Sequence, residues 1–76
     1  MAMTKKELQN YNTLRIVRGG TSVVAALQYS VTERTHIAVM PASGTVGTVR
    51  AEQIRLTDEL IPRIVREQDG TIRLDL

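Results

Sequence analysis

Hydrophobic and polar residues alternate with a period of two in two segments of the chain. From residue 23 to residue 31 every odd position is apolar, and from residue 72 to residue 76 every even position is apolar. This alternation is typical of β-strands with one buried face, so we expect strands in both places. A helix over residues 21–29 is the alternative for the first segment, because two alanines, a leucine and a glutamine in a row also favour a helix.

Other apolar runs are short, rich in valine, isoleucine and threonine, and separated by turn residues, as in small β-proteins. We expect further strands at residues 14–18, 37–40, 45–50 and 54–56. The pair Gly19-Gly20 is free to adopt positive φ angles and predicts a tight reversal. Residues 31–35 predict a polar turn. The strand at residues 37–40 is apolar on both faces, so we expect it to be central and covered on each side.

The N-terminal segment, residues 1–12, has the sequence pattern of a short helix or arm. Thr4 is followed three positions later by Glu7, the reciprocal arrangement that satisfies the first free backbone amides of a helix. Only Leu8 and Tyr11 are placed to pack inward, so this helix would be marginal by itself.

Several features interrupt regular structure between residues 47 and 63. Gly47 lies within an expected strand, where we expect a sharp corner of the sheet. Residues 51–53 resemble a single helical turn. Residues 57–60 are a second possible helix start, but Pro62 disfavours helical geometry at the residue before it, so we expect the chain to bend there.

Residues 63–76 predict a C-terminal β-hairpin around Asp69-Gly70, a favoured pair for a two-residue turn. In the register of such a turn, Val65 faces Leu74. The alternating apolar residues at the C-terminus then form one face of the hairpin.

The same register places Arg66 opposite Arg73. Like charges opposed across two strands destabilise the pair unless an anion or an acidic partner lies between them. This is the best local indication of a binding site. Neutralisation by Glu67, Asp69 or Asp75, or a different register, is the alternative.

Together these elements predict one all-β or β-rich α+β domain over residues 1–76. We expect a small SH3-like barrel or a strongly bent antiparallel sheet, preceded by the short N-terminal helix. Residues 47–58 resemble the strand, short turn and strand that close many SH3-like barrels, and they are similar to the corresponding stretch of MazF-type ribonuclease toxins. No residue matches the catalytic arginine and hydroxyl pair of those toxins, so the resemblance concerns only the fold.

Size and composition indicate that the domain needs a partner. A chain of 76 residues without cysteine, tryptophan or phenylalanine has a thin core and no disulfide, so we expect self-association. No apolar stretch approaches the roughly 20 residues of a membrane span, and residues 1–6 lack the apolar segment of a secretory signal. We therefore expect a cytoplasmic protein without membrane contact.

No residue pattern indicates catalysis, a metal or a cofactor. His36 is the only histidine, which excludes a two-histidine metal site, and we expect it to be structural or on the surface rather than a general base. Ser43-Gly44 lacks an orienting base and a carboxylate, and phosphate-loop and dinucleotide motifs are missing. We expect no cofactor and no enzymatic activity, with a small nuclease as the most distant alternative.

The basic residues are mostly arginine, whose planar fork suits bidentate contact with phosphate or carboxylate. The net charge of +2 is too small to indicate a nucleic-acid binder by itself. Pairing with the chain's own acids is the alternative role for these arginines. The candidate residues for binding an anion or a partner are Arg50, Arg55, Arg63, Arg66 and Arg73.

We therefore predict a non-enzymatic binding or assembly module that forms a homo-oligomer and has an arginine-bearing face for an acidic protein or nucleic acid. A small nucleic-acid-binding barrel, with arginines on the DNA or RNA backbone, is the alternative function. The chain has only two aromatic residues, both tyrosines, and this shortage argues against recognition of single strands by stacking.

Overall fold

The computed structural model describes residues 1–40 and 52–76. These residues form mostly β-structure, as the alternation predicts, and the helix alternative for residues 21–29 is wrong. The elements, in chain order, are α1 (Lys5–Leu8), β1 (Thr13–Arg18), β2 (Thr21–Ser30), β3 (Thr35–Met40), β4 (Glu52–Arg55), the 3-10 turn η1 (Ile61–Arg63), β5 (Val65–Arg66) and β6 (Ile72–Asp75).

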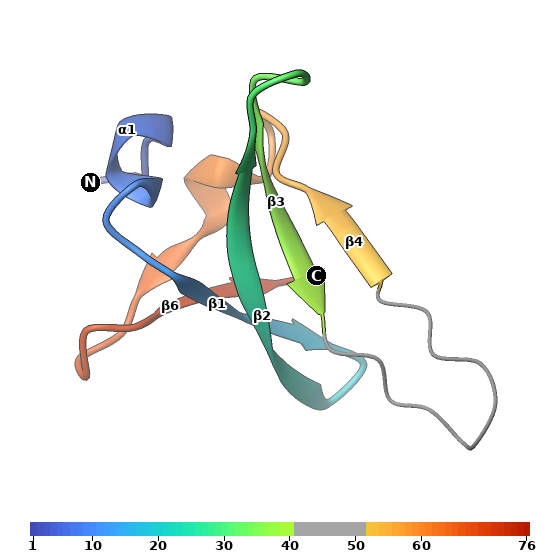
Figure 1. The fold of residues 1–76 in the computed structure, drawn as a ribbon. Helices are drawn as coiled ribbons and strands as arrows, with labels where there is room; N and C mark the ends of the chain where they lie inside the picture. The colour runs from blue at the N-terminus through green and yellow to red at the C-terminus, as the bar shows by residue number, and fades with distance from the viewer. Residues whose placement is uncertain (41–51) are drawn as a thin grey trace, which may run out of the picture.

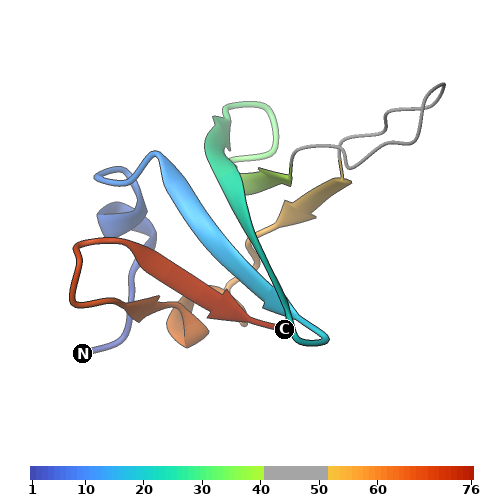
Figure 2. The same cartoon turned by 90° about the horizontal axis from the view of Figure 1, so that it is seen from below.

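The described strands form one strongly bent sheet in the order β4-β3-β2-β1-β6-β5 (Figure 1). β1 to β4 are an antiparallel meander, and β5 and β6 are an antiparallel hairpin. β6 lies parallel to β1, so the sheet is mixed rather than wholly antiparallel. The sheet is open, with β4 and β5 at its edges, so the bent-sheet expectation is confirmed and the closed barrel is wrong. Figure 2 shows the bend from below, with β1 and β6 turned away from β3 and β4.

The bend brings the end of β1 near the start of β4, although β2 and β3 separate these strands in the sheet. Arg18 donates two hydrogen bonds to the carboxylate of Glu52, at 2.8 and 2.9 Å. This bidentate pair joins residues 34 positions apart and holds one end of the curled sheet together.

The core lies on the inner face of the sheet, where alternate residues of the longer strands point, and α1 lies beside one end of it (Figure 1). Thr4 caps α1 as predicted, since its hydroxyl accepts a hydrogen bond from the Glu7 N–H at 3.2 Å. Leu8 is fully buried and Tyr11 packs against the core, which confirms their inward placement. The buried apolar residues are Met3, Leu8, Leu14, Ile16, Ala25, Ala38, Met40, Leu56, Ile61, Ile64, Ile72 and Leu74.

Two turns that connect the meander agree with their predictions. Gly19 and Gly20 have φ angles of 57° and 78°, which gives β1 and β2 the expected tight reversal. The turn between β2 and β3 contains Arg34 with a φ of 54°, a conformation uncommon for a residue with a side chain. This turn therefore presents Arg34 at a defined place beside the start of β3.

The C-terminal hairpin forms, but its predicted register is wrong by one residue. Arg73 pairs with Val65 and not with Arg66, so the two arginines do not face each other. The Gly70 N–H donates to the carbonyl oxygen of Glu67 at 3.2 Å, and Gly70 has a φ of 88°. The loop is therefore a turn followed by a left-handed glycine, which contains one residue more than the predicted turn.

Three further expectations need correction or limitation. Glu52 and Gln53 begin β4 and are not a helical turn. β3 is central, since it pairs with β2 and β4, but only its inner face is fully buried. Apolar alternation in β2 buries Ala25 but leaves Tyr29 largely exposed.

The predicted bend near Pro62 is confirmed by η1. The strand predicted at residues 45–50 lies outside the described residues.

Candidate functional site

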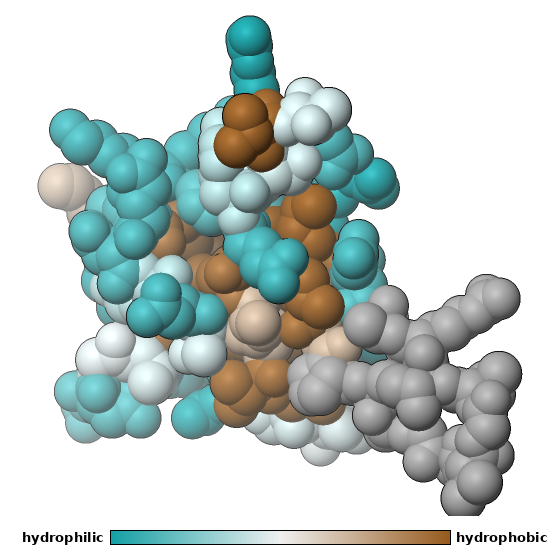
Figure 3. Space-filling model, in the orientation of Figure 1, coloured by the Kyte–Doolittle hydropathy of each residue, from teal (hydrophilic) through white to brown (hydrophobic). Residues whose placement is uncertain are grey.

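The outer face of the sheet carries aliphatic side chains that are not part of the core. On β2, Val24 is 57% exposed and Ala26 is also exposed. Ala26 pairs with Val39 of β3, and Val17 of β1 and Ile37 of β3 are half-buried on the same face. We call these five residues the outer patch. Figure 3 shows hydrophobic atoms gathered over the middle of this view, where β2 and β3 lie, with hydrophilic atoms around them.

Arginines border the outer patch. Arg15 of β1 lies directly beside Arg73 of β6 in the parallel register, and Arg55 of β4 pairs with Ile37. Arg55 and Arg73 therefore share the outer face of the sheet with Arg15. Sequence reasoning missed Arg15, although its place between Leu14 and Ile16 in an alternating strand could have indicated the outward position.

Acidic side chains of the chain itself neutralise two of these arginines. Arg73 contacts Glu67 at 2.7 Å and Asp75 at 3.0 Å, and Arg55 contacts Glu33 at 2.8 Å. No ion pair to Arg15 occurs within residues 1–40 and 52–76. The outer face thus carries both signs of charge.

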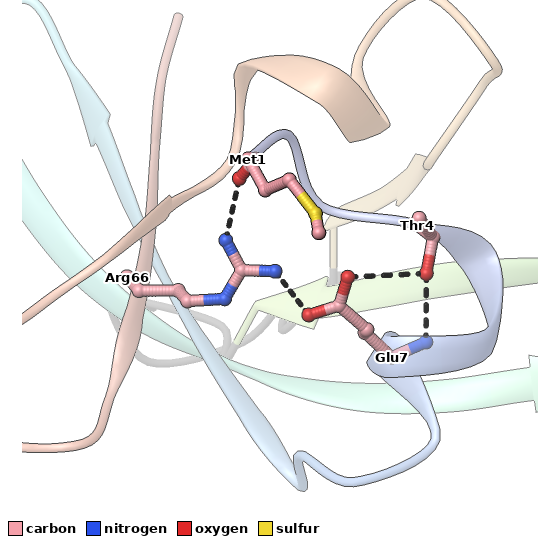
Figure 4. A network of polar contacts seen from close by, with 4 residues as sticks. All are labelled: Met1, Thr4, Glu7 and Arg66. Carbon is pink, nitrogen blue, oxygen red and sulfur yellow. Dashed lines mark hydrogen bonds and ion pairs between the residues drawn. The ribbon is translucent and has the colours of Figure 1, made fainter.

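Arg66 and Arg63 connect distant parts of the chain. Arg66 donates to the carbonyl oxygen of Met1 at 2.8 Å and pairs with the carboxylate of Glu7 (Figure 4). Its hydrogen bond lowers the pKa of Glu7 below the ordinary value, with a smaller contribution from Thr4. Arg63 donates to the carbonyl oxygen of Asp75 at 2.8 Å. Arg66 therefore links β5 to α1 through its ion pair with Glu7. Binding at the predicted arginines stays a prediction, and Arg50 lies outside the described residues.

A groove runs beside α1 at the end of β2 and the start of β3. Two adjoining cavities of about 270 and 340 Å³ form it, and both are lined by Gln9, Tyr29 and His36. We call the two cavities together the α1 groove. The first is also lined by Lys5, Lys6, Arg34, Thr35 and Ile61. The second is also lined by Leu8, Tyr11, Asn12, Leu27 and Gln28.

Tyr29 and His36 form an aromatic pair between the two cavities. They are cross-strand partners, and their rings meet edge to face with centroids 4.9 Å apart. His36 is buried, and burial lowers its pKa below the ordinary value. Its imidazole is therefore neutral at neutral pH. No carboxylate lines the groove among the described residues, so His36 has no acidic partner there for catalysis.

The rim of the α1 groove is cationic. Lys5 is paired with Asp58 at 2.8 Å, and hydrogen bonding to Asp58 raises the pKa of Lys5. Lys6 and Arg34 form no ion pair with any residue that the structure describes. The groove thus combines free positive charge, an exposed aromatic ring and side-chain amides, a set that suits a flat anionic ligand.

Residues 1–40 and 52–76 contain no group of three or more histidine, cysteine, aspartate or glutamate side chains that could hold a metal ion. None of their helices is long and apolar enough to cross a membrane. No family model, curated protein or solved structure matches this chain.

Proposed function

We propose that this chain is a non-enzymatic binding and assembly module that self-associates through the outer patch. The observation that supports this function is the exposure of Val24 and Ala26 in the middle of a sheet face. Burying apolar surface of this kind contributes roughly 25 cal/mol per Å². Small aliphatic side chains also allow two sheets to pack face to face at close distance.

A second copy of the chain is the occupant that fits this face best. The border of the outer patch carries Arg15 and Arg55 together with Asp75 and Glu33, so a copy related by two-fold symmetry can bring opposite charges together. The domain also gains from association, because a core of this size supplies little stability by itself. The same arginines give the module a surface for an acidic partner.

Two aspartate substitutions on or near β2 test this function. Val24→Asp places a charge in the outer patch, whereas Val31→Asp places the same charge on a side chain that is 80% exposed in the next turn. Light scattering at micromolar concentration should show more than one chain for the wild type and for Val31→Asp, and one chain for Val24→Asp. Circular dichroism verifies that each variant is folded. A folded wild-type monomer, or equal dissociation by both variants, contradicts the proposal.

A further inference from the structure

We propose that the α1 groove binds single-stranded nucleic acid, with bases stacked on Tyr29 and Tyr11 and the phosphate backbone at Lys6 and Arg34. This site is separate from the outer patch and does not depend on self-association. The two adjoining cavities, divided by the Tyr29–His36 pair, correspond to two successive nucleotides.

The positions of the two tyrosines support stacking more strongly than their number suggests. Both aromatic residues of the chain line the second cavity, so the scarce aromatic surface is concentrated at one place. Tyr29 is 53% exposed, which leaves part of its ring available, and His36 contacts the ring and fixes its orientation. A ring held in place before binding loses little conformational entropy when a base stacks on it.

Side-chain amides around the tyrosines suit the edges of bases. Gln9 lines both cavities, and Asn12 and Gln28 line the second. Each amide offers both a donor and an acceptor, as base edges do. Unpaired bases expose their Watson–Crick edges to such groups, whereas paired bases do not.

Lys6 and Arg34 supply the charge for the backbone. Both line the first cavity, and neither is neutralised by an acid among the described residues. Lys6 is exposed on α1, and Arg34 is presented by the turn with its positive φ angle. A strand that passes both residues would release the counterions of two phosphates, which makes binding salt-dependent.

A single strand fits this geometry better than a duplex. The bases of a duplex are stacked on one another and would have to be unstacked to reach Tyr29 or Tyr11. The rigid duplex backbone could still contact Lys6 and Arg34, but only through charge. Competition between single-stranded and duplex oligonucleotides therefore distinguishes base stacking from simple attraction to phosphate.

The first experiment measures the anisotropy of a fluorescein-labelled oligothymidylate of about eight nucleotides at low salt. Tyr29→Ala should raise the dissociation constant by about 5- to 150-fold, the effect of losing one stacked base. Tyr29→Phe, which keeps the ring, should recover most of this loss. Val31→Ala, on an exposed neighbour outside the groove, should bind like the wild type. Circular dichroism verifies folding of each variant.

The second experiment compares variants that each lose one positive charge. Lys6→Gln and Arg34→Gln should each make the plot of log K against log salt shallower by about 0.7, because one phosphate contact is lost. Arg18→Gln, at an exposed side chain outside the groove, should leave the slope close to that of the wild type, and circular dichroism verifies that each variant is folded. No wild-type binding at low salt, equal competition by a duplex, or equal effects of the groove variants and Arg18→Gln would overturn the proposal.

Discussion

Replacing Leu74 with alanine tests how the C-terminal hairpin joins the rest of the fold. Leu74 is fully buried and lies beside Ile16 in the parallel pairing of β6 with β1. Truncating a buried leucine to alanine costs about 2–5 kcal/mol, through lost burial and the cavity that remains. A single core in a domain of 76 residues rarely supplies more than about 3–5 kcal/mol of unfolding free energy. Leu74→Ala should therefore remove a large fraction of the total stability.

Leu76→Ala is the matched control, because the same side chain is 43% exposed two residues later. It should lower the free energy of unfolding by less than about 1 kcal/mol. The assay is urea unfolding followed by far-UV circular dichroism at several protein concentrations, since association makes the midpoint concentration-dependent. Equal losses in the two variants would refute the burial pattern and the register of β6.

Three more predictions follow from individual residues. Burial lowers the pKa of His36 below its ordinary value of 6.5. The contribution of neutral His36 to the free energy of unfolding should therefore be fully present above pH 6.5 and should decrease as the pH drops through and below that value. Urea midpoints at about pH 7.5 and about pH 5.5 should differ in the wild type and much less in His36→Gln. Gly70→Ala should destabilise the hairpin by about 1–2 kcal/mol in urea unfolding, because alanine is strained at its φ of 88°, and Gly70→Asn should cost less. Arg66→Gln should return the pKa of Glu7 toward its ordinary value in a carbon-13 NMR titration, and an unchanged pKa would show that the contact with Arg66 does not form in solution.

Features that depend on neighbouring residues could be predicted from the sequence. The cap of α1 follows from Thr4 and Glu7, and the β1–β2 reversal follows from two glycines, because each signal lies within a few residues of the structure that it determines. β2 was also predictable from its period of two, despite a local composition that favours a helix. The surrounding strands decide the conformation of such a segment.

Features that depend on distant residues were not predictable in the same way. The parallel pairing of β6 with β1 joins Arg73 to Arg15, and no local pattern specifies it. The predicted hairpin register was wrong because Asp69-Gly70 suits a two-residue turn. In the structure, Gly70 instead follows a turn that begins at Glu67. A shift of one residue moves each side chain to a different partner.

In the candidate sites, too, contacts between residues distant in the sequence were harder to predict than local features. Binding at the arginines stays a prediction, whereas the alternative of pairing with the chain's own acids occurs at Arg73, with Glu67 and Asp75, and at Arg55, with Glu33. The α1 groove joins residues of the N-terminal helix to residues of β2, β3 and the turn between them, so its lining could not be assembled from spacing alone. Tyr11 and Tyr29 were noted for their scarcity, and only the fold brings them together.

The most direct test of assembly through the outer patch is an isotope-filtered NOE experiment on a mixture of labelled and unlabelled chains. The proposed packing of two sheet faces predicts cross-chain NOEs from the methyl groups of Val24 and Val39. Cross-chain NOEs confined to the sheet edges at β4 or β5, or no cross-chain NOEs in a sample that light scattering shows to be oligomeric, would contradict assembly through this face.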